Sequence, residues 1–417
     1  MIPSILSQQI DQGLKDFLST TFHSTNPLFH NMLDRFLDRD GALNKGPYIS
    51  LQLPFQKGSS QEFFPEIPLG FTPHLHQELA FARLCGQNPL PTLIASGTGS
   101  GKTECFSQPI LEHCRTSDQP GIKAILIYPM NALAYDQAGR LAQTIWHTPS
   151  LHSKITAGLF VGQQTAEACS SMTENSLITD KDILRQSPPD ILLTNYKMLD
   201  YLLVRARDAR LWAQNGPETL RFVVVDELHT FDGAQGTDLA CLLRRLKARL
   251  GTPEGHLCTI GTSATLGDAD SQDRLIRYAQ QVFGEPFDQD SVIPEYRQKA
   301  EDFLRGQPIE NLDIPDSAKA LSPGNYASAG DFLAAQVQMW TKMQVEPNDD
   351  HPSWRVELGK ALKGHVLVHI LLQVMDGRVR SVQDIVNELA RSSSQQLASG
   401  CGPPGTTRPS AGQIGPG

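Results

Sequence analysis

Residues 96–103 read Ser-Gly-Thr-Gly-Ser-Gly-Lys-Thr, and this stretch decides how the chain folds. Its glycines let backbone N–H groups point inward at a polyphosphate, while Lys102 can reach the β- and γ-phosphates and the Thr103 hydroxyl can ligate Mg²⁺. The usual loop of this kind begins with Gly, where this chain has Ser96. Residues 91–94 read as a strand before the loop, and helical sequence follows it. The expected phosphate-binding residues are Ser96, Gly97, Thr98, Gly99, Ser100, Gly101, Lys102 and Thr103.

A second stretch, residues 226–229, reads Asp-Glu-Leu-His and directly follows the apolar run Phe222–Val225. Asp226 is placed to hold Mg²⁺ together with Thr103, and Glu227 is placed to polarise an attacking water. Lys102, Asp226 and Glu227 are therefore the expected catalytic residues. Together the two stretches predict a protein that binds and hydrolyses ATP with Mg²⁺ as its cofactor.

The composition indicates a globular chain of 417 residues with two or three domains. No apolar run approaches the roughly 18 residues of a membrane helix, and the N-terminus lacks the pattern of a signal peptide. The seven cysteines include no Cys-x-x-Cys pair, which argues against structural zinc and against a disulfide framework. We expect free thiols, a cytoplasmic location and no membrane. The formal net charge of −9 neither supports nor excludes a nucleic-acid partner.

Strand and helix patterns alternate between residues 71 and 290, which is typical of a doubly wound parallel α/β sheet. The expected strands are 92–95, 124–128, 157–161, 191–194, 222–225 and 258–261. Both stretches above follow the carboxyl ends of such strands, where ligands bind in open sheets. We expect residues 1–70 to form a helical N-terminal extension packed on this domain. We expect residues 291–392 to form a helical segment and residues 393–417 to be a disordered Ser/Gly/Pro-rich tail.

The order of the motifs resembles the first RecA-like lobe of superfamily 2 DExH-box (DEAD/DEAH-box) helicases. Residues 226–229 and Gly-Thr-Ser-Ala-Thr at 261–265 look like motifs II and III of that family. The resemblance implies a RecA-like fold of the P-loop NTPase class. Residues 226–233 and 242–246 look most like the branch of Hrq- and MrfA-type repair helicases and of the large helicases of phage defence.

The resemblance also implies roles for single residues. Residues 71–77 look like the element that reads adenine, with Gln77 as its reader, although Gln77 also fits a surface helix. His229 would be a further catalytic residue, and with Ser263 and Thr265 it would couple the nucleotide to motif III. A hydrogen-bonded crevice histidine is the other interpretation of His229. The residues expected to contact nucleic acid are Pro129 and Asn131 in motif Ia and Thr194 and Asn195 in motif Ib.

Basic residues follow motif Ib and occupy the helix before motif III. Arg205, Arg207 and Arg210 are candidates for phosphate contact. For the second group a solvated helix face is the favoured interpretation and nucleic-acid contact the other one. That group consists of Arg244, Arg245, Lys247 and Arg249.

A motor of this superfamily needs a second RecA-like lobe with arginine fingers, and no Gln-x-x-Gly-Arg-x-x-Arg string follows residue 268. We interpret the chain as the ATP-binding lobe of an ATP-dependent helicase or translocase acting on nucleic acid, with DNA favoured over RNA. The residues after 290 resemble part of an insertion, and a truncated gene product is the favoured explanation of the tail. The missing lobe would then come from a second polypeptide. A non-motor nucleic-acid-binding or scaffolding module and a double-strand translocase are the alternatives.

Overall fold

The computed structural model describes residues 3–29, 31–39, 42–43, 45, 47–59, 62–162, 168–264, 269–309, 318–346 and 353–400. The chain divides into two compact units. One unit is Phe55–Arg297, and the other joins Met1–Pro54 to Gln298–Gly417. Among the described residues, no helix has the length and apolar character needed to cross a membrane.

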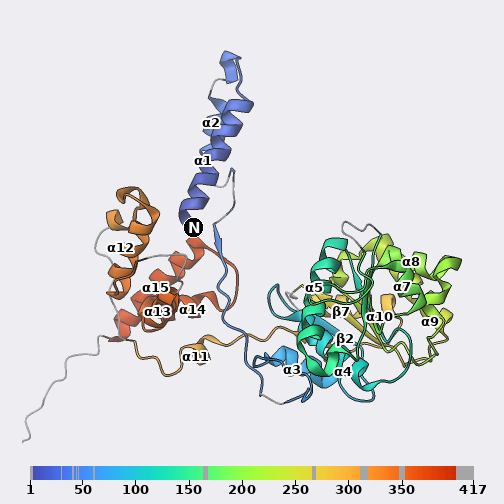
Figure 1. Ribbon diagram of the computed structural model, residues 1–417. Coiled ribbons are helices and arrows are strands. Elements are labelled where there is room, and N and C mark those ends of the chain that lie inside the picture. Colours follow the sequence, from blue (N-terminus) through green and yellow to red (C-terminus); the bar gives the residue numbers. More distant parts are fainter. Residues whose placement is uncertain are drawn as a thin grey trace, which may run out of the picture. The chain divides into compact units, whose positions relative to one another are not determined.

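A seven-stranded parallel sheet forms the centre of the unit Phe55–Arg297 (Figure 1), with the strand order β4-β5-β3-β6-β7-β2-β8. The strands are β2 (Thr92–Ala95), β3 (Ala124–Tyr128), β4 (Ala157–Phe160), β5 (Ile191–Asn195), β6 (Phe222–Val225), β7 (Cys258–Ser263) and β8 (Val292–Pro294). The expected α/β class and RecA-like parallel sheet are confirmed. Strand β8 was not predicted, because three residues that end in Pro294 read as a loop; proline is tolerated there since β8 is an edge strand.

Helices cover both faces of this sheet, since successive strand residues point to opposite sides. Ile94, Leu126 and Val224 pack into one apolar cluster with residues of α3 (Leu75–Leu84), α4 (Lys102–Thr116) and α5 (Asn131–His147). Their strand neighbours pack into a second cluster with α8 (Tyr196–Val204), α9 (Gly233–Leu250) and α10 (Ala269–Phe283). The shorter helices of the unit are α6 (Pro149–His152), α7 (Lys181–Gln186), η2 (Ala206–Trp212), η3 (Leu228–Thr230) and η4 (Gln289–Ser291). Burial on both faces explains why the strands are apolar runs.

The second unit is mostly helical and contains one two-stranded antiparallel sheet among its described residues. In that sheet β1 (Tyr48–Ile49) pairs with β9 (Arg380–Ser381). The helices are α1 (Pro3–Thr21), η1 (Pro27–Phe29), α2 (Met32–Leu37), α11 (Ala300–Phe303), η5 (Ala318–Leu321), η6 (Pro323–Asn325), α12 (Ala329–Thr341), α13 (Ser353–Lys363), α14 (Val366–Met375) and α15 (Val382–Gly400). The helical character expected for residues 1–70 is present in residues 3–37, and that expected for residues 291–392 is present in α11 to α15.

The structure divides the chain at other residues than the sequence indicated. Residues 1–54 group with the C-terminal segment rather than with the sheet unit, because β1 finds its partner in β9. Phe64 and Ile67, by contrast, are 3% and 1% exposed in the core of the sheet unit, so residues 55–70 belong there. Strand β8 moves the other boundary from residue 290 to Arg297.

Helix α15 runs through residue 393, where the sequence predicted the start of a disordered tail. Residues 395–398 are Gln, Gln, Leu and Ala, which are good helix formers, so the helix continues to Gly400. Residues 401–417 lie outside the described residues.

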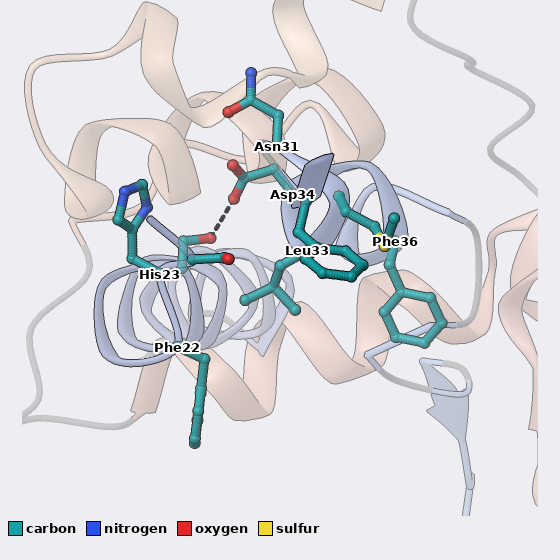
Figure 2. A pocket seen from close by; sticks show the side chains of 10 residues that line it. Phe22, His23, Asn31, Leu33, Asp34 and Phe36 are labelled. Atoms are coloured by element: carbon teal, nitrogen blue, oxygen red, sulfur yellow. Dashed lines mark hydrogen bonds between the residues drawn. The ribbon is translucent and has the colours of Figure 1, made fainter. Parts of the chain in front are cut away.

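A hollow of about 360 Å³ lies between the end of α1 and α2 (Figure 2). Phe22, Leu33 and Phe36 contribute to its apolar lining, and Ser19 Oγ donates a hydrogen bond to Asp34 Oδ1 at 2.5 Å. The hollow shares no residue with the phosphate loop or with residues 226–229.

Candidate nucleotide site

The carboxyl ends of β2, β6 and β7 lie together because these strands are parallel neighbours in the sheet. The phosphate loop follows β2, residues 226–229 follow β6, and Ser263 ends β7. Stretches that are far apart in the sequence therefore meet at one edge of the sheet, where open α/β sheets bind their ligands.

The phosphate loop has the backbone that its glycines predict. Gly99 and Gly101 have φ angles of 77° and 79°, which only glycine adopts without strain. Ser96 is buried, and its Oγ lies 2.7 Å from the Oγ of Ser100. The serine that replaces the usual first glycine therefore bonds across the loop. Lys102 is the first residue of α4, so the positive end of the helix dipole faces the loop.

Lys102 and Glu227 form the central ion pair of the site. Lys102 Nζ lies 3.2 Å from Glu227 Oε1, and the two side chains are 14% and 30% exposed. Glu227 has φ 49° and ψ 49°, a left-handed conformation that is uncommon for a residue with a β-carbon. Such strain persists only where neighbouring contacts impose it, and it is typical of functional sites.

Thr262 supplies those contacts. Its Oγ1 accepts a hydrogen bond from the Glu227 N–H at 2.9 Å and donates one to Asp226 Oδ1 at 2.5 Å. The sequence analysis missed Thr262 as a site residue. Its role depends on the register of β7 against β6, in which Val225 pairs with Gly261 and Asp226 comes beside Thr262, and no local sequence pattern gives that register.

Asp226 has a raised pKa, chiefly because burial disfavours its charged form. The hydrogen bond from Thr262 and the charge of Lys102 lower the pKa of Asp226, while the charge of Glu227 raises it further. A divalent cation would favour the ionised carboxylate, as a candidate metal ligand requires.

His229 is the last residue of motif II and contacts a residue of motif III; its coupling role stays a prediction. Its Nδ1 is 3.4 Å from Glu227 Oε2 and also 3.4 Å from Ser263 Oγ. The structure therefore brings together His229, Glu227 and Ser263. Thr265, the other expected coupling residue, lies outside the described residues.

Gln77 is 2% exposed, which excludes the surface-helix interpretation. Its Oε1 accepts a hydrogen bond from the His74 N–H at 2.8 Å, and its Nε2 donates to the Gly101 carbonyl at 3.3 Å. The neighbouring His76 Nε2 donates to the Ser100 carbonyl at 2.8 Å. Both side chains tie α3 to the phosphate loop. His76 was missed by the sequence analysis, because a buried histidine beside an apolar run gives no pattern of its own.

Two of the expected nucleic-acid residues meet directly. Asn195 Nδ2 donates to Asn131 Oδ1 at 2.7 Å, so motifs Ia and Ib share a hydrogen bond. Asn195 also caps α8 by accepting from the Met198 N–H at 2.8 Å. Thr194 is fully buried, and its hydroxyl donates to the Phe160 carbonyl at 2.7 Å, so this hydroxyl bonds to the neighbouring strand β4. Pro129 is half-buried between β3 and α5.

Three of the four basic residues of α9, Arg244, Arg245 and Arg249, are exposed, as the favoured interpretation predicted, and all four also bond to neighbouring elements. Arg245 pairs with Asp200, and Lys247 pairs with Glu285. Arg244 donates to the Gln281 carbonyl at 3.0 Å and Arg249 to the Leu203 carbonyl at 3.2 Å. These bonds join α9 to its neighbours. After motif Ib, Arg205 pairs with the buried Asp208 at 3.4 Å, while Arg207 and Arg210 are exposed.

The residues at this edge fit a nucleotide with Mg²⁺. The loop offers backbone N–H groups and Lys102, while Thr103 and Asp226 offer two oxygens for a metal. Among the described residues, no group of three or more His, Cys, Asp or Glu side chains could hold a metal ion. Mg²⁺ suits such a sparse set, because it is usually held by one or two protein oxygens together with water and substrate phosphates.

Comparison with known proteins assigns this arrangement to a class. Residues 74–273 match the family model of DEAD/DEAH box helicases, so this stretch is a DEAD/DEAH box helicase domain. The predicted likeness to superfamily 2 DExH-box helicases, and to the branch of Hrq- and MrfA-type repair helicases and large phage-defence helicases, is confirmed.

Individual relatives are similar over different lengths. The Druantia protein DruE of Escherichia coli (strain UMEA 4076-1) is 24% identical over 518 residues, covering 94% of this chain and 28% of the relative. The uncharacterized ATP-dependent helicase MJ1574 of Methanocaldococcus jannaschii is 29% identical over 198 residues, covering 48% of this chain and 26% of the relative. The crystal structure of the DUF1998 helicase MrfA bound to DNA superposes with a TM-score of 0.44 at 21% identity, covering 59% of this chain and 32% of that one.

Asp226→Asn should make the unit Phe55–Arg297, called the helicase unit from here on, more stable at neutral pH. The folded-state pKa of Asp226 is raised, so the folded protein binds this proton more tightly than the unfolded chain does, and stability falls as pH rises. The substitution removes that loss. Thermal unfolding without metal should show a higher Tm for Asp226→Asn at pH 7, and the gain should shrink as the pH falls toward the ordinary pKa of an aspartate, near 4. An equal gain at pH 7 and at pH 4 would contradict the assigned burial of the charge.

Proposed function

We propose that this chain binds Mg-ATP at the carboxyl edge of its parallel sheet and couples the nucleotide to a nucleic acid, DNA rather than RNA. The observation that carries the proposal is the meeting of Lys102, Glu227 and Asp226, which come from the ends of two strands and are tied to a third through Thr262. When bound, Mg-ATP supplies the phosphoanhydride bond that is cleaved and the metal charge that offsets developing negative charge.

Each residue has a distinct role in this proposal. Lys102 would exchange its ion pair with Glu227 for phosphate oxygens, which would leave the Glu227 carboxylate free to accept a proton from water. Asp226 and Thr103 would hold the metal, and Gln77, which bonds to the loop at Gly101, would read the adenine. His229 relays the state of Glu227 to Ser263 through its two contacts of 3.4 Å.

Lys102→Ala should weaken Mg-ATP binding at least tenfold, because the phosphates lose their charged partner; tenfold corresponds to about 1.4 kcal/mol. Titration calorimetry measures this, with Lys154→Ala, an exposed lysine before β4, as the matched control. Removing Mg²⁺ with a chelator should weaken binding to the wild type as well. Equal ATP affinity in wild type and Lys102→Ala would reject the nucleotide site.

The nucleic-acid part of the proposal rests on motifs Ia and Ib. They lie at the carboxyl ends of neighbouring strands β3 and β5, and Asn131 and Asn195 join them. DNA is favoured because the motif string resembles the branch that contains DNA-repair helicases. Such contacts position the phosphate backbone and carry little sequence information.

Binding of a labelled single-stranded DNA should therefore be independent of sequence and should fall roughly tenfold or more between 50 and 200 mM salt. Asn131→Ala should weaken it further, since Asn195 loses its partner. Asn88→Ala serves as the matched control. Asn88 is exposed, and the residues beside it come before the start of strands β6 and β7, whereas motifs Ia and Ib follow the ends of strands. A parallel titration with RNA of the same sequence should show weaker binding. Salt-independent binding, or equal loss in both variants, would count against this interface.

We propose that the arginines of a complete motor come from a separate polypeptide or from another part of a longer protein. The chain spans about a quarter of the length of the two curated relatives described above. Outside the helicase unit, the described residues form one two-stranded antiparallel sheet and no second parallel lobe.

We also propose a cytoplasmic location for the protein, because the described cysteines are free thiols: Cys85, Cys105, Cys114, Cys169, Cys241 and Cys258.

The chain alone should hydrolyse ATP close to the background rate, and DNA should stimulate it less than about twofold, because a supplied arginine is worth about 10³–10⁵ in rate. Glu227→Gln should change this residual rate little. A phosphate-release assay with and without DNA measures both effects. Strong DNA-stimulated turnover that Glu227→Gln abolishes would show that the chain is a complete motor.

A further inference from the structure

The edge strand β8 ends beside the phosphate loop. It pairs in parallel with β2, and Pro294 lies opposite Ala95, the last residue before the loop. Glu295 follows, and its Oε2 accepts a hydrogen bond from the Gly97 N–H at 2.9 Å. A carboxylate near the end of the helicase unit thus holds the second residue of the loop.

Glu295 is itself held by a charged and aromatic stack. Arg297 Nε donates to Glu295 Oε1 at 2.6 Å, and the side chains of Glu295 and Arg297 are 13% and 22% exposed. The Arg297 guanidinium carbon lies 4.1 Å from the centre of the Phe55 ring. Charge-assisted hydrogen bonds and cation–π contacts of this kind are strengthened by partial burial. The orientation of the Glu295 carboxylate is therefore set by its partners.

The same stack reaches the far end of the loop. The Phe55 ring lies 5.4 Å from the ring of His76, which donates to the Ser100 carbonyl. Thr98 and Gly99, at the apex of the loop, are exposed. The loop is thus anchored at both ends and open between them, which is where an anion would have to enter.

We propose that Glu295 is a positioning residue for the phosphate loop, holding the Gly97 N–H so that the loop keeps the conformation that receives phosphates. Glu295 acts through the loop and does not itself touch the nucleotide. Arg297 balances its negative charge, so the carboxylate does not cancel the attraction of the loop for anions. This inference rests on the proposed binding of Mg-ATP by residues 96–103.

Two substitutions separate the hydrogen bond from the charge. Glu295→Ala removes the acceptor, and Mg-ATP affinity measured by calorimetry should fall about tenfold. Glu295→Gln keeps an amide oxygen for the Gly97 N–H, and its affinity should stay within about twofold of wild type. The control is Asp290→Ala, an exposed carboxylate before the start of β8, which should leave the affinity unchanged.

Amide hydrogen exchange of the nucleotide-free protein tests the same contact without ATP. Residues 96–101 should exchange faster in Glu295→Ala and at the wild-type rate in Glu295→Gln. If Glu295→Ala fails to fold, Arg297→Gln takes its place and should also speed exchange. Unchanged exchange in Glu295→Ala, or in Arg297→Gln where it takes that place, would overturn the inference. Tighter ATP binding by Glu295→Ala would also overturn it, since the carboxylate would then compete with phosphate. If the wild type does not bind ATP, the proposed function fails, while the exchange measurement still decides the role of Glu295.

Discussion

The register between β6 and β7 is the constraint on which the nucleotide site depends. Because Val225 pairs with Gly261, Asp226 and Glu227 leave the sheet beside Thr262, and one hydroxyl satisfies both. A slip of one residue would point Thr262 to the opposite face of the sheet and leave the strained backbone of Glu227 without its hydrogen bond. Close packing on both faces prevents such a slip, since the buried apolar residues of the strands are divided between two clusters, one on each face.

The arrangement at the end of this sheet explains how the carboxylates of Asp226 and Glu227 can lie next to each other. Asp226 and Glu227 are adjacent carboxylates, and each would raise the cost of ionising the other if they had no partners. Lys102 faces Glu227 and Thr262 faces Asp226, so the two negative groups have separate partners. The ion pair also keeps the Lys102 ammonium at the position from which it can reach a phosphate. The protein itself therefore fixes the positions of these charged groups, which reduces the reorganisation that binding a ligand requires.

Much of this could be predicted from the sequence. Six strands lie within two residues of their expected positions because each is an apolar run, and the residues around the loop and at 226–229 meet because parallel strands end at one edge. Thr262, His76 and Glu295 could not be found in this way, because their importance lies in the partner each one meets and not in any local pattern. The unit boundaries were misplaced for the same reason: β1 and β9 are two-residue strands whose pairing spans most of the chain. Local periodicity carries no information about such distant pairs.

The helicase unit interrupts the other unit, and its own ends lie together: Phe55 and Arg297 form an isolated antiparallel bridge. Folding of the sheet therefore brings the two flanking segments, residues 1–54 and 298–417, to neighbouring starting points. The pairing of Tyr48 with Ser381 then closes a much shorter effective loop than their separation in sequence suggests, which lowers its entropic cost. The sheet unit thus lowers the entropic cost of joining two segments of the other unit that are far apart in the sequence.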